Sequence, residues 1–242
     1  MPAAETQATL RRCFARLGLP QQIRVDNGTP WGSRGDLPTG LELWLAGLGV
    51  GVRANRPRRP QDNGVVERSQ GTGKRWAEPH RAGSAQELQA TIDAMDRRQR
   101  ESYPYHGRAS RLQAHPELEH SGRAYEASRE PESWSMERVG ELLAGSVVPR
   151  RVDAKGTASV YGRNYYVGQA YAEQVVYVRY DPQQGLWLFQ DDEGHQLNRR
   201  KAEEINAANI RELMVPERRV RSGAAAEAKP PVAIPPEELG VG

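Results

Sequence analysis

The sequence has very little cysteine and no long apolar run. Cys13 is the only cysteine in 242 residues, which excludes a disulfide framework and a zinc site built on several cysteines. No stretch approaches the roughly 18 consecutive apolar residues that a membrane-spanning helix needs. Residues 1–10 also lack the apolar run of a signal peptide. We therefore expect a cytoplasmic protein that does not enter a membrane.

Several common catalytic signatures are also absent from the sequence. It has neither the Gly-x-Ser-x-Gly motif of serine hydrolases nor the Gly-rich loop of the Walker type that binds nucleotide phosphates. No two histidines are four residues apart on a predicted helix, and none lies near a pair of cysteines, so a zinc site is not expected. The five histidines are His80, His106, His115, His120 and His195.

Positive charge is concentrated in one segment, although the net charge is only +3. Between Arg53 and Arg75 there are seven cations and two acids, a local charge of +5 (7 − 2). Such a patch attracts a phosphate backbone. A solvated loop with its usual charges is the alternative interpretation. The cations are Arg53, Arg56, Arg58, Arg59, Arg68, Lys74 and Arg75.

The first hundred residues show the periodicities of helices and short strands. Leu10, Phe14 and Leu17 have the spacing of a buried helix face, and Ser84 with Glu87 forms a capping box. Gly71 and Gly73 predict a helix that frays beyond Ser69. Helices are expected at residues 4–17, 41–48, from 65 onward and 84–103, and strands at 23–25 and 50–52. Trp31, Trp44 and Trp76 are interpreted as core or core-edge residues.

The remaining chain changes from polar to β-rich and then to a low-complexity tail. Residues 101–145 are interpreted as a connector with short helices, one of them at 135–144. Five short β-type runs with intervening turn signals predict a small antiparallel barrel at 146–206. Residues 207–242 are expected to form a disordered tail. The expected strands are 147–148, 158–161, 165–167, 175–180 and 186–189.

Two carboxylates could form a metal site. Asp26 ends the strand at 23–25, and Glu67 lies in the first turn of the helix that begins at 65. Each has a structural explanation, because Asp-Asn-Gly is a common turn and a helix dipole favours Glu in a first turn. Together they could hold Mg²⁺ (or Mn²⁺), which takes carboxylate oxygens and substrate phosphates as ligands.

The segments around both carboxylates resemble a known family. Ile23–Gly28 resembles the segment around the second Asp of the retroviral-integrase-like DDE transposase core, and Arg56–Arg68 resembles the segment around that core's Glu in the bacterial insertion-sequence branch. The pattern Pro, Gln, Asn-Gly and Glu-Arg carries the second match. Tyr161–Val167 resembles part of the SH3-type barrel that follows this core in several transposases. The resemblance covers about residues 4–206.

The resemblance implies a fold and a set of roles. The fold class is α/β, a partial RNase H-like core at 1–100, whose first three strands and first Asp are missing, followed by the SH3-type barrel. Asp26 and Glu67 would be the catalytic metal ligands. DNA would be bound by Arg53, Arg56, Arg58, Arg59, Asn63, Arg68, Lys74 and Arg75.

The implied function is DNA transposition or integration by metal-assisted phosphodiester cleavage and strand transfer. With only two of three carboxylates, we expect this chain to be incomplete or inactive alone. The expected partners are DNA and either further copies of the chain or a full-length transposase, in a bacterial cytoplasm near the nucleoid. Two alternatives remain open: a non-catalytic remnant that binds DNA or a transposase, and a chain in which only the barrel folds, as an interaction module.

Overall fold

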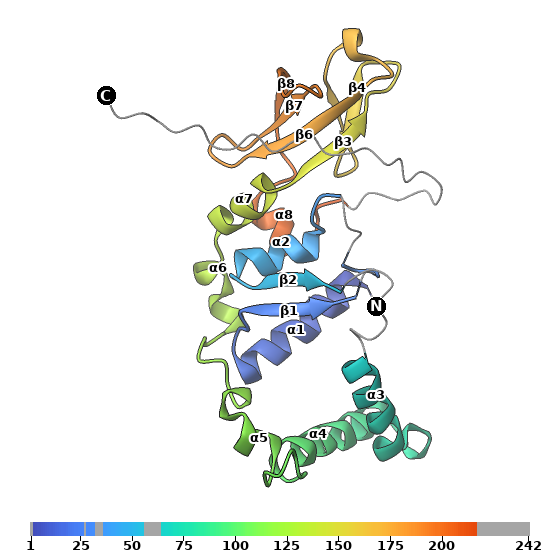
Figure 1. Ribbon diagram of the computed structural model, residues 1–242, viewed down its shortest axis with the longest axis vertical. Helices are drawn as coiled ribbons and strands as arrows, with labels where there is room; N and C mark the ends of the chain where they lie inside the picture. The colour runs from blue at the N-terminus through green and yellow to red at the C-terminus, as the bar shows by residue number, and fades with distance from the viewer. Residues whose placement is uncertain (1, 27, 32–35, 56–63, 217–242) are drawn as a thin grey trace, which may run out of the picture. The chain divides into compact units, whose positions relative to one another are not determined.

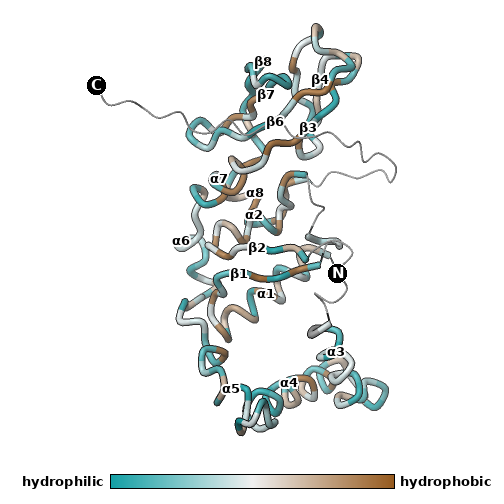
Figure 2. The backbone as a smooth tube through the Cα atoms, viewed as in Figure 1, coloured by the Kyte–Doolittle hydropathy of each residue, from teal (hydrophilic) through white to brown (hydrophobic). Residues whose placement is uncertain are grey.

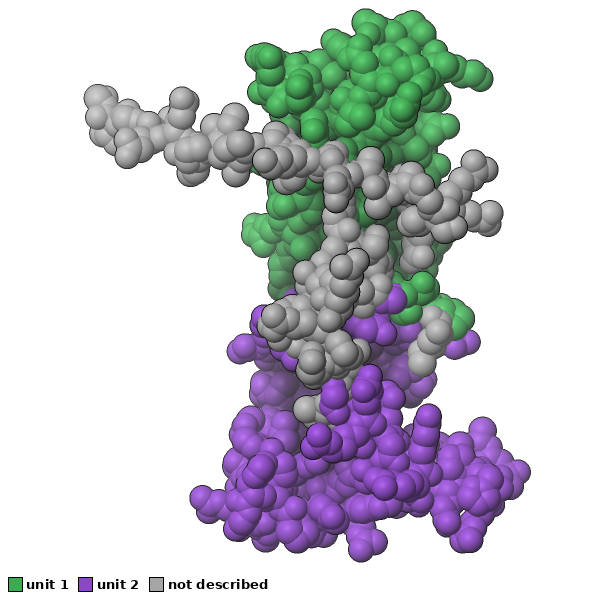
Figure 3. Space-filling model, turned by 45° about the vertical axis from the view of Figure 1, so that its right-hand side comes forward, with its two compact units in different colours: residues 1–4, 29–49, 134–242 green, residues 5–28, 50–133 purple. Residues whose placement is uncertain are grey.

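The computed structural model describes residues 2–26, 28–31, 36–55 and 64–216. These residues form two compact units (Figure 3). Unit 1 contains the described parts of Met1–Ala4, Thr29–Gly49 and Trp134–Gly242, and unit 2 contains those of Glu5–Gly28 and Val50–Ser133. The division at residues 100, 145 and 206 stays a prediction. No helix in the described ranges is long and apolar enough to cross a bilayer.

The sheet of unit 2 has two parallel strands, β1 (Gln22–Val25) and β2 (Gly51–Ala54) (Figure 1). Both predicted strands are confirmed, each within two residues at its ends. Successive side chains of a strand point to opposite faces of the sheet. Val25 is buried on one face, whereas Arg24 and Arg53 are exposed on the other. One face is therefore packed and one is open to solvent.

Three longer helices accompany this sheet in unit 2: α1 (Ala3–Leu17), α3 (Gly64–Ala77) and α4 (Ala85–Glu101). The Ser84 hydroxyl caps α4 by accepting from the Glu87 N–H at 3.1 Å. The Glu87 carboxylate accepts from Gly83 N–H at 2.8 Å, one residue earlier than the predicted capping box requires. The connector that follows contains α5 (Arg111–Ala114), α6 (Glu130–Ser133) and short 3-10 turns.

The prediction that α3 frays beyond Ser69 was wrong. The helix continues through Gly71 and Gly73 to Ala77. Each interior glycine costs only about 0.5–1 kcal/mol relative to alanine, and α3 packs against α4 along this stretch. Tertiary contact therefore outweighs the low helix propensity of the two glycines.

A buried cluster joins α1 to the connector inside unit 2. Glu130 is 2% exposed and accepts two hydrogen bonds from the Arg11 guanidinium, at 2.9 and 2.7 Å. The Tyr125 hydroxyl also donates to Glu130, and its ring packs edge-on against Phe14. These contacts connect residues more than a hundred positions apart in the sequence.

The centre of unit 1 is α2 (Gly40–Gly47), which packs against α7 (Met136–Ala144). Its N-terminus has a complete capping box between Thr39 and Glu42. At its other end the Gly47 carbonyl accepts from the Arg138 guanidinium at 2.6 and 3.0 Å. A cation at a helix C-terminus is favoured by the helix dipole. The Trp134 ring lies directly against Gly47.

Gly47→Ala is expected to lower the free energy of unfolding by about 1–3 kcal/mol, the usual cost of overpacking. An added Cβ would lie 2.0 Å from the Trp134 ring, and this clash outweighs the gain in helix propensity. Gly71→Ala is the matched control, because a Cβ there meets nothing within 4 Å. Urea unfolding should show that Gly71→Ala stabilises by about 0.5–1 kcal/mol. Equal effects of both variants would contradict the close packing at Gly47.

The β-rich part of unit 1 contains a four-stranded antiparallel sheet in the order β3-β6-β7-β8 and a separate β4-β5 hairpin. Alternate residues of β6 and β7 are buried, including Val176, Val178, Trp187 and Phe189. The strands are β3 (Val147–Arg151), β4 (Thr157–Val160), β5 (Arg163–Tyr166), β6 (Val175–Asp181), β7 (Leu186–Gln190) and β8 (Gln196–Lys201). The first five match the predicted runs, and β8 was not predicted.

The expected SH3-type barrel is not closed in the described part of the chain. The β4-β5 hairpin meets β8 through side chains instead of a backbone ladder. Asn198 donates from its amide to the Val167 carbonyl at 2.8 Å, and Arg200 donates to the Tyr166 carbonyl at 3.1 Å. The fold class shown is therefore mixed α/β with separate sheets.

The buried residue Glu204 also connects the β4-β5 hairpin to the four-stranded sheet. It is 2% exposed and accepts from the Trp187 indole N–H at 2.8 Å and from the Tyr165 hydroxyl. One carboxyl group thus connects β5, β7 and the segment after β8.

The prediction that a disordered tail begins at residue 207 was wrong for the residues up to 216. Ala207–Arg211 forms α8, with Asn206 as its N-cap. Ile210 and Val215 are buried, and α8 packs against α2. The apolar side chains at these two positions explain why this segment folds. Residues 217–242 lie outside the described part of the chain.

Candidate functional site

Asp26 directly follows β1, at the carboxyl end of the parallel pair. In the register of the two strands Val25 lies opposite Ala54, so Asp26 and Asn55 follow their strands at the same edge. Asp26 is exposed, and its carboxylate accepts from the Gly28 N–H at 3.1 Å, as in an Asx turn. Ligands of open α/β sheets bind at the carboxyl ends of the strands. Asp26 is therefore accessible at an edge suited to binding.

Glu67 lies in the first turn of α3, and its side chain is exposed. In the view of Figure 1, the carboxyl ends of β1 and β2 and the first turn of α3 lie on the right-hand side of unit 2. Residues 56–63, which connect β2 to α3, lie outside the described residues.

The predicted DNA-binding residues fall into three groups. Arg53 is exposed on β2, and Arg68, Lys74 and Arg75 are exposed along α3. Lys74 and Arg75 are in the last helical turn. The other four, Arg56, Arg58, Arg59 and Asn63, lie outside the described residues.

The carboxylate groups of Asp26 and Glu67 match Mg²⁺ in ligand type. Mg²⁺ is usually bound by one or two protein carboxylates, with water and substrate phosphate completing its shell. Within the described ranges, no group of three or more His, Cys, Asp or Glu side chains could hold a metal ion. Any metal site there would depend on the two carboxylates and on ligands from a substrate or another chain.

Comparison with solved structures yields a distant similarity. No protein-family model matches the chain. A chain in the cryoEM structure of the simian T-cell lymphotropic virus intasome in complex with PP2A regulatory subunit B56 gamma is similar to this one, with a TM-score of 0.39 and 17% sequence identity. The similarity covers 78% of this chain and 58% of that chain, so this chain spans less than two thirds of its length.

Arg24 is a candidate residue that sequence reasoning missed. The parallel register places it beside Arg53, and both side chains are exposed on the open face of the sheet. Two neighbouring guanidinium groups on one face favour an anionic partner. The motif Ile23–Gly28 contains Arg24. That Arg53 lies beside it depends on the pairing of β1 with β2, and the local sequence does not indicate this pairing.

Trp76 also differs from its prediction as a core or core-edge residue. It is among the exposed large apolar residues, with 38% of its surface exposed, whereas Trp44 is fully buried as expected. Trp76 directly follows Lys74 and Arg75 in the sequence of α3, and the Arg98 guanidinium lies over its ring. The sequence signal for a binding role was the position of Trp76 directly after Lys74 and Arg75.

Proposed function

We propose that this chain is a DNA transposition or integration protein of the DDE type. The observation that supports this proposal is the placement of the two motif carboxylates. Asp26 is exposed at the carboxyl end of a parallel strand pair, and Glu67 is exposed in the first turn of the next helix of unit 2. An RNase H-like core, of which this α/β unit would be a part, places carboxylates on such elements.

Asp26 and Glu67 would hold Mg²⁺ or Mn²⁺. When bound, the metal would activate a nucleophilic oxygen and stabilise the leaving oxygen of a phosphodiester. The residues of the chain itself would hold the DNA. Arg53, Arg68, Lys74 and Arg75 present exposed cations near these carboxylates in the sequence, and they would neutralise backbone phosphates.

Neutralising the cations of α3 is expected to weaken duplex DNA binding. Arg68, Lys74 and Arg75 changed together to Gln should remove up to three phosphate contacts. The slope of log K against log salt should fall by about 2 to 3, since each phosphate contact contributes about 0.9. Fluorescence anisotropy with a labelled duplex at several salt concentrations measures this slope.

A matched triple variant tests whether the effect belongs to α3. Arg179, Arg199 and Lys201 are exposed on β6 and β8 of unit 1, and changing them to Gln removes the same charge from the β-rich part. This control should leave the slope nearly unchanged. If both triple variants reduce the slope equally, DNA binding follows total charge, and the assignment to α3 is wrong.

A non-catalytic DNA- or transposase-binding role is the second candidate. It is favoured by the exposed cations Arg53, Arg68, Lys74 and Arg75, which can hold backbone phosphates without a metal site. Nicking and strand-transfer assays with Mn²⁺ separate the two candidates. Activity that is lost in Asp26→Asn and Glu67→Gln supports a working site, and an inactive chain that still binds DNA supports the second role.

A further inference from the structure

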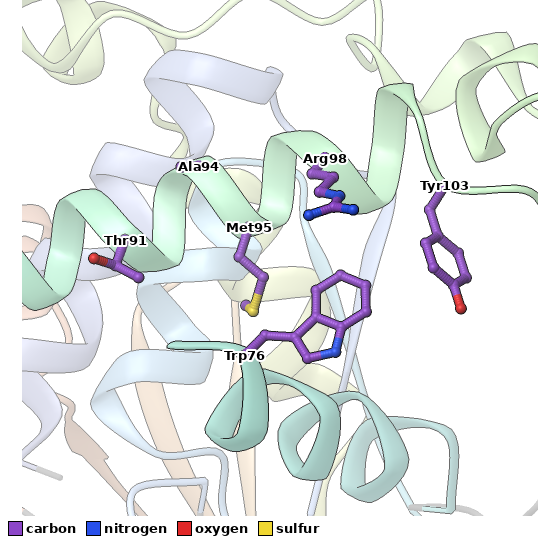
Figure 4. Close-up of a pocket in the computed structure, with 6 residues that line it drawn as sticks. All are labelled: Trp76, Thr91, Ala94, Met95, Arg98 and Tyr103. Atoms are coloured by element: carbon purple, nitrogen blue, oxygen red, sulfur yellow. The ribbon is translucent and has the colours of Figure 1, made fainter. Parts of the chain in front are cut away.

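The end of α3 and the second half of α4 form a groove lined by aromatic and apolar side chains (Figure 4). Its volume is about 540 Å³. The lining residues are Trp76, Thr91, Ala94, Met95, Arg98 and Tyr103. The Trp76 and Tyr103 rings are 5.5 Å apart and inclined by 60°. Rings at that angle do not stack face to face on each other.

These aromatic side chains are not part of a hydrophobic core. Trp76 is 38% exposed and Tyr103 49% exposed. No residue of α4 is buried, and Figure 2 shows this helix as mainly hydrophilic with scattered apolar residues. Large exposed apolar groups gathered in one groove mark a binding surface more often than a structural one.

Several cations lie on the two helices that form the groove. Arg98 lies over the Trp76 ring, with its guanidinium carbon 5.7 Å from the ring centroid. Lys74 and Arg75 precede Trp76 on α3, and Arg97 is exposed on α4. In the described part of the chain, none of these four cations has a carboxylate within 4.0 Å. An anionic occupant would therefore complement the rim.

We propose that this groove binds an unpaired nucleobase of single-stranded DNA. Trp76 and Tyr103 would contact the base, and Arg98, Lys74 and Arg75 would hold the flanking phosphates. Exposed aromatic rings within a positive groove are the usual means of binding single strands, because every base has a π face. An apolar helix of a partner protein would contact the apolar residues of the groove but would provide no anionic group for the cations. The inference rests on the proposed function, because a protein that joins DNA ends handles unpaired nucleotides.

The experiment measures binding of the full chain to an oligothymidine that carries one 2-aminopurine. Stacking on Trp76 should quench the 2-aminopurine fluorescence. Trp76→Ala should abolish the quenching and weaken single-strand binding about tenfold or more, as expected from the loss of one stacked base. Trp76→Phe should retain most of both signals. Binding to a duplex of the same length should change less than about twofold, because phosphate contacts dominate there.

Tyr166→Ala is the matched control, because Tyr166 is also 49% exposed but lies on β5 of unit 1. It should leave single-strand binding and quenching unchanged. Circular dichroism of each variant confirms folding, and Tyr103→Leu provides a second substitution that keeps apolar volume while removing the ring. An oligouridine of the same length shows whether DNA or RNA is preferred, and a preference for RNA would overturn the assignment to DNA.

The outcomes separate this inference from the proposed function. If the wild-type chain binds duplex DNA through the α3 cations but Trp76→Ala has no effect on quenching, the inference alone fails. If Trp76→Ala weakens single-strand and duplex binding equally, base stacking is also excluded. If the wild-type chain binds neither form of DNA, both proposals fail. Loss of a dimer in Trp76→Ala without loss of DNA binding would show that the groove docks a second copy.

Discussion

Replacing Glu204 by alanine is expected to lower the free energy of unfolding by about 3 kcal/mol or more. The variant leaves the Trp187 indole N–H and the Tyr165 hydroxyl without their acceptor in a buried site. Each buried polar group that loses its partner costs about 1–3 kcal/mol. The carboxyl also connects β5 to β7, so its loss should loosen the attachment of the β4-β5 hairpin.

Urea unfolding followed by tryptophan fluorescence measures this loss. Four of the five tryptophans, Trp31, Trp44, Trp134 and Trp187, belong to unit 1, so the signal reports mainly on that unit. Glu203→Ala is the matched control. Glu203 is the adjacent residue, is exposed, and pairs with Arg163 on the surface. Surface pairs contribute about 0–1 kcal/mol, so similar losses in both variants would contradict a special role for Glu204.

The same site gives the stability a dependence on alkaline pH. Burial, and then the hydrogen bond to Glu204, raise the pKa of the Tyr165 hydroxyl above its usual value. A raised tyrosine pKa stabilises the fold fully below the unfolded pKa of about 10, and this contribution is lost as the pH rises through the folded pKa. In an ultraviolet absorbance titration Tyr165 should therefore ionise only as the chain unfolds.

Local signals in the sequence predicted most of the helices and strands correctly. The cap at Ser84 and the apolar spacing of Leu10, Phe14 and Leu17 depend only on neighbouring residues, and α4 and α1 begin and end close to the predicted positions. The β8 strand was missed because Gln196–Lys201 contains one apolar residue, Leu197. That segment becomes a strand by pairing with β7, which is a contact that no local pattern indicates.

The sequence could predict individual residues of the candidate site but not which of them lie side by side. The motifs identified Asp26 and Glu67 as residues, and the structure exposes both. Their sequence neighbours could not indicate that Arg24 lies beside Arg53, because this depends on the register of two strands that are about thirty residues apart. Trp76 was predicted to be a core or core-edge residue, which matches the high average burial of tryptophan. Trp76 is exposed because α4, against which it packs, contains no buried residue and so provides no core.

Removing Glu130 is expected to destabilise unit 2 by about 3 kcal/mol or more, since breaking a buried ion pair leaves an uncompensated charge. The Glu130 carboxylate is nearly inaccessible and satisfies both the Arg11 guanidinium and the Tyr125 hydroxyl. In Glu130→Ala, Arg11 keeps its hydrogen bond to Gln7 but loses its carboxylate partner, so it should move further into solvent and loosen α1. Hydrogen exchange of the α1 amides, with urea unfolding by far-ultraviolet circular dichroism, measures both consequences.

Two comparisons decide whether the ion pair or the packing is responsible. Glu132→Ala removes a carboxylate from the same short helix, but that residue is 68% exposed and pairs with Arg129 at the surface, so its loss should cost under about 1 kcal/mol. The double variant Arg11→Met with Glu130→Met removes both charges and should recover part of the stability lost in Glu130→Ala. Recovery would show that the unpaired Arg11 charge causes the loss of stability in Glu130→Ala. A double variant as unstable as Glu130→Ala would instead assign the loss to packing and to the unsatisfied Tyr125 hydroxyl.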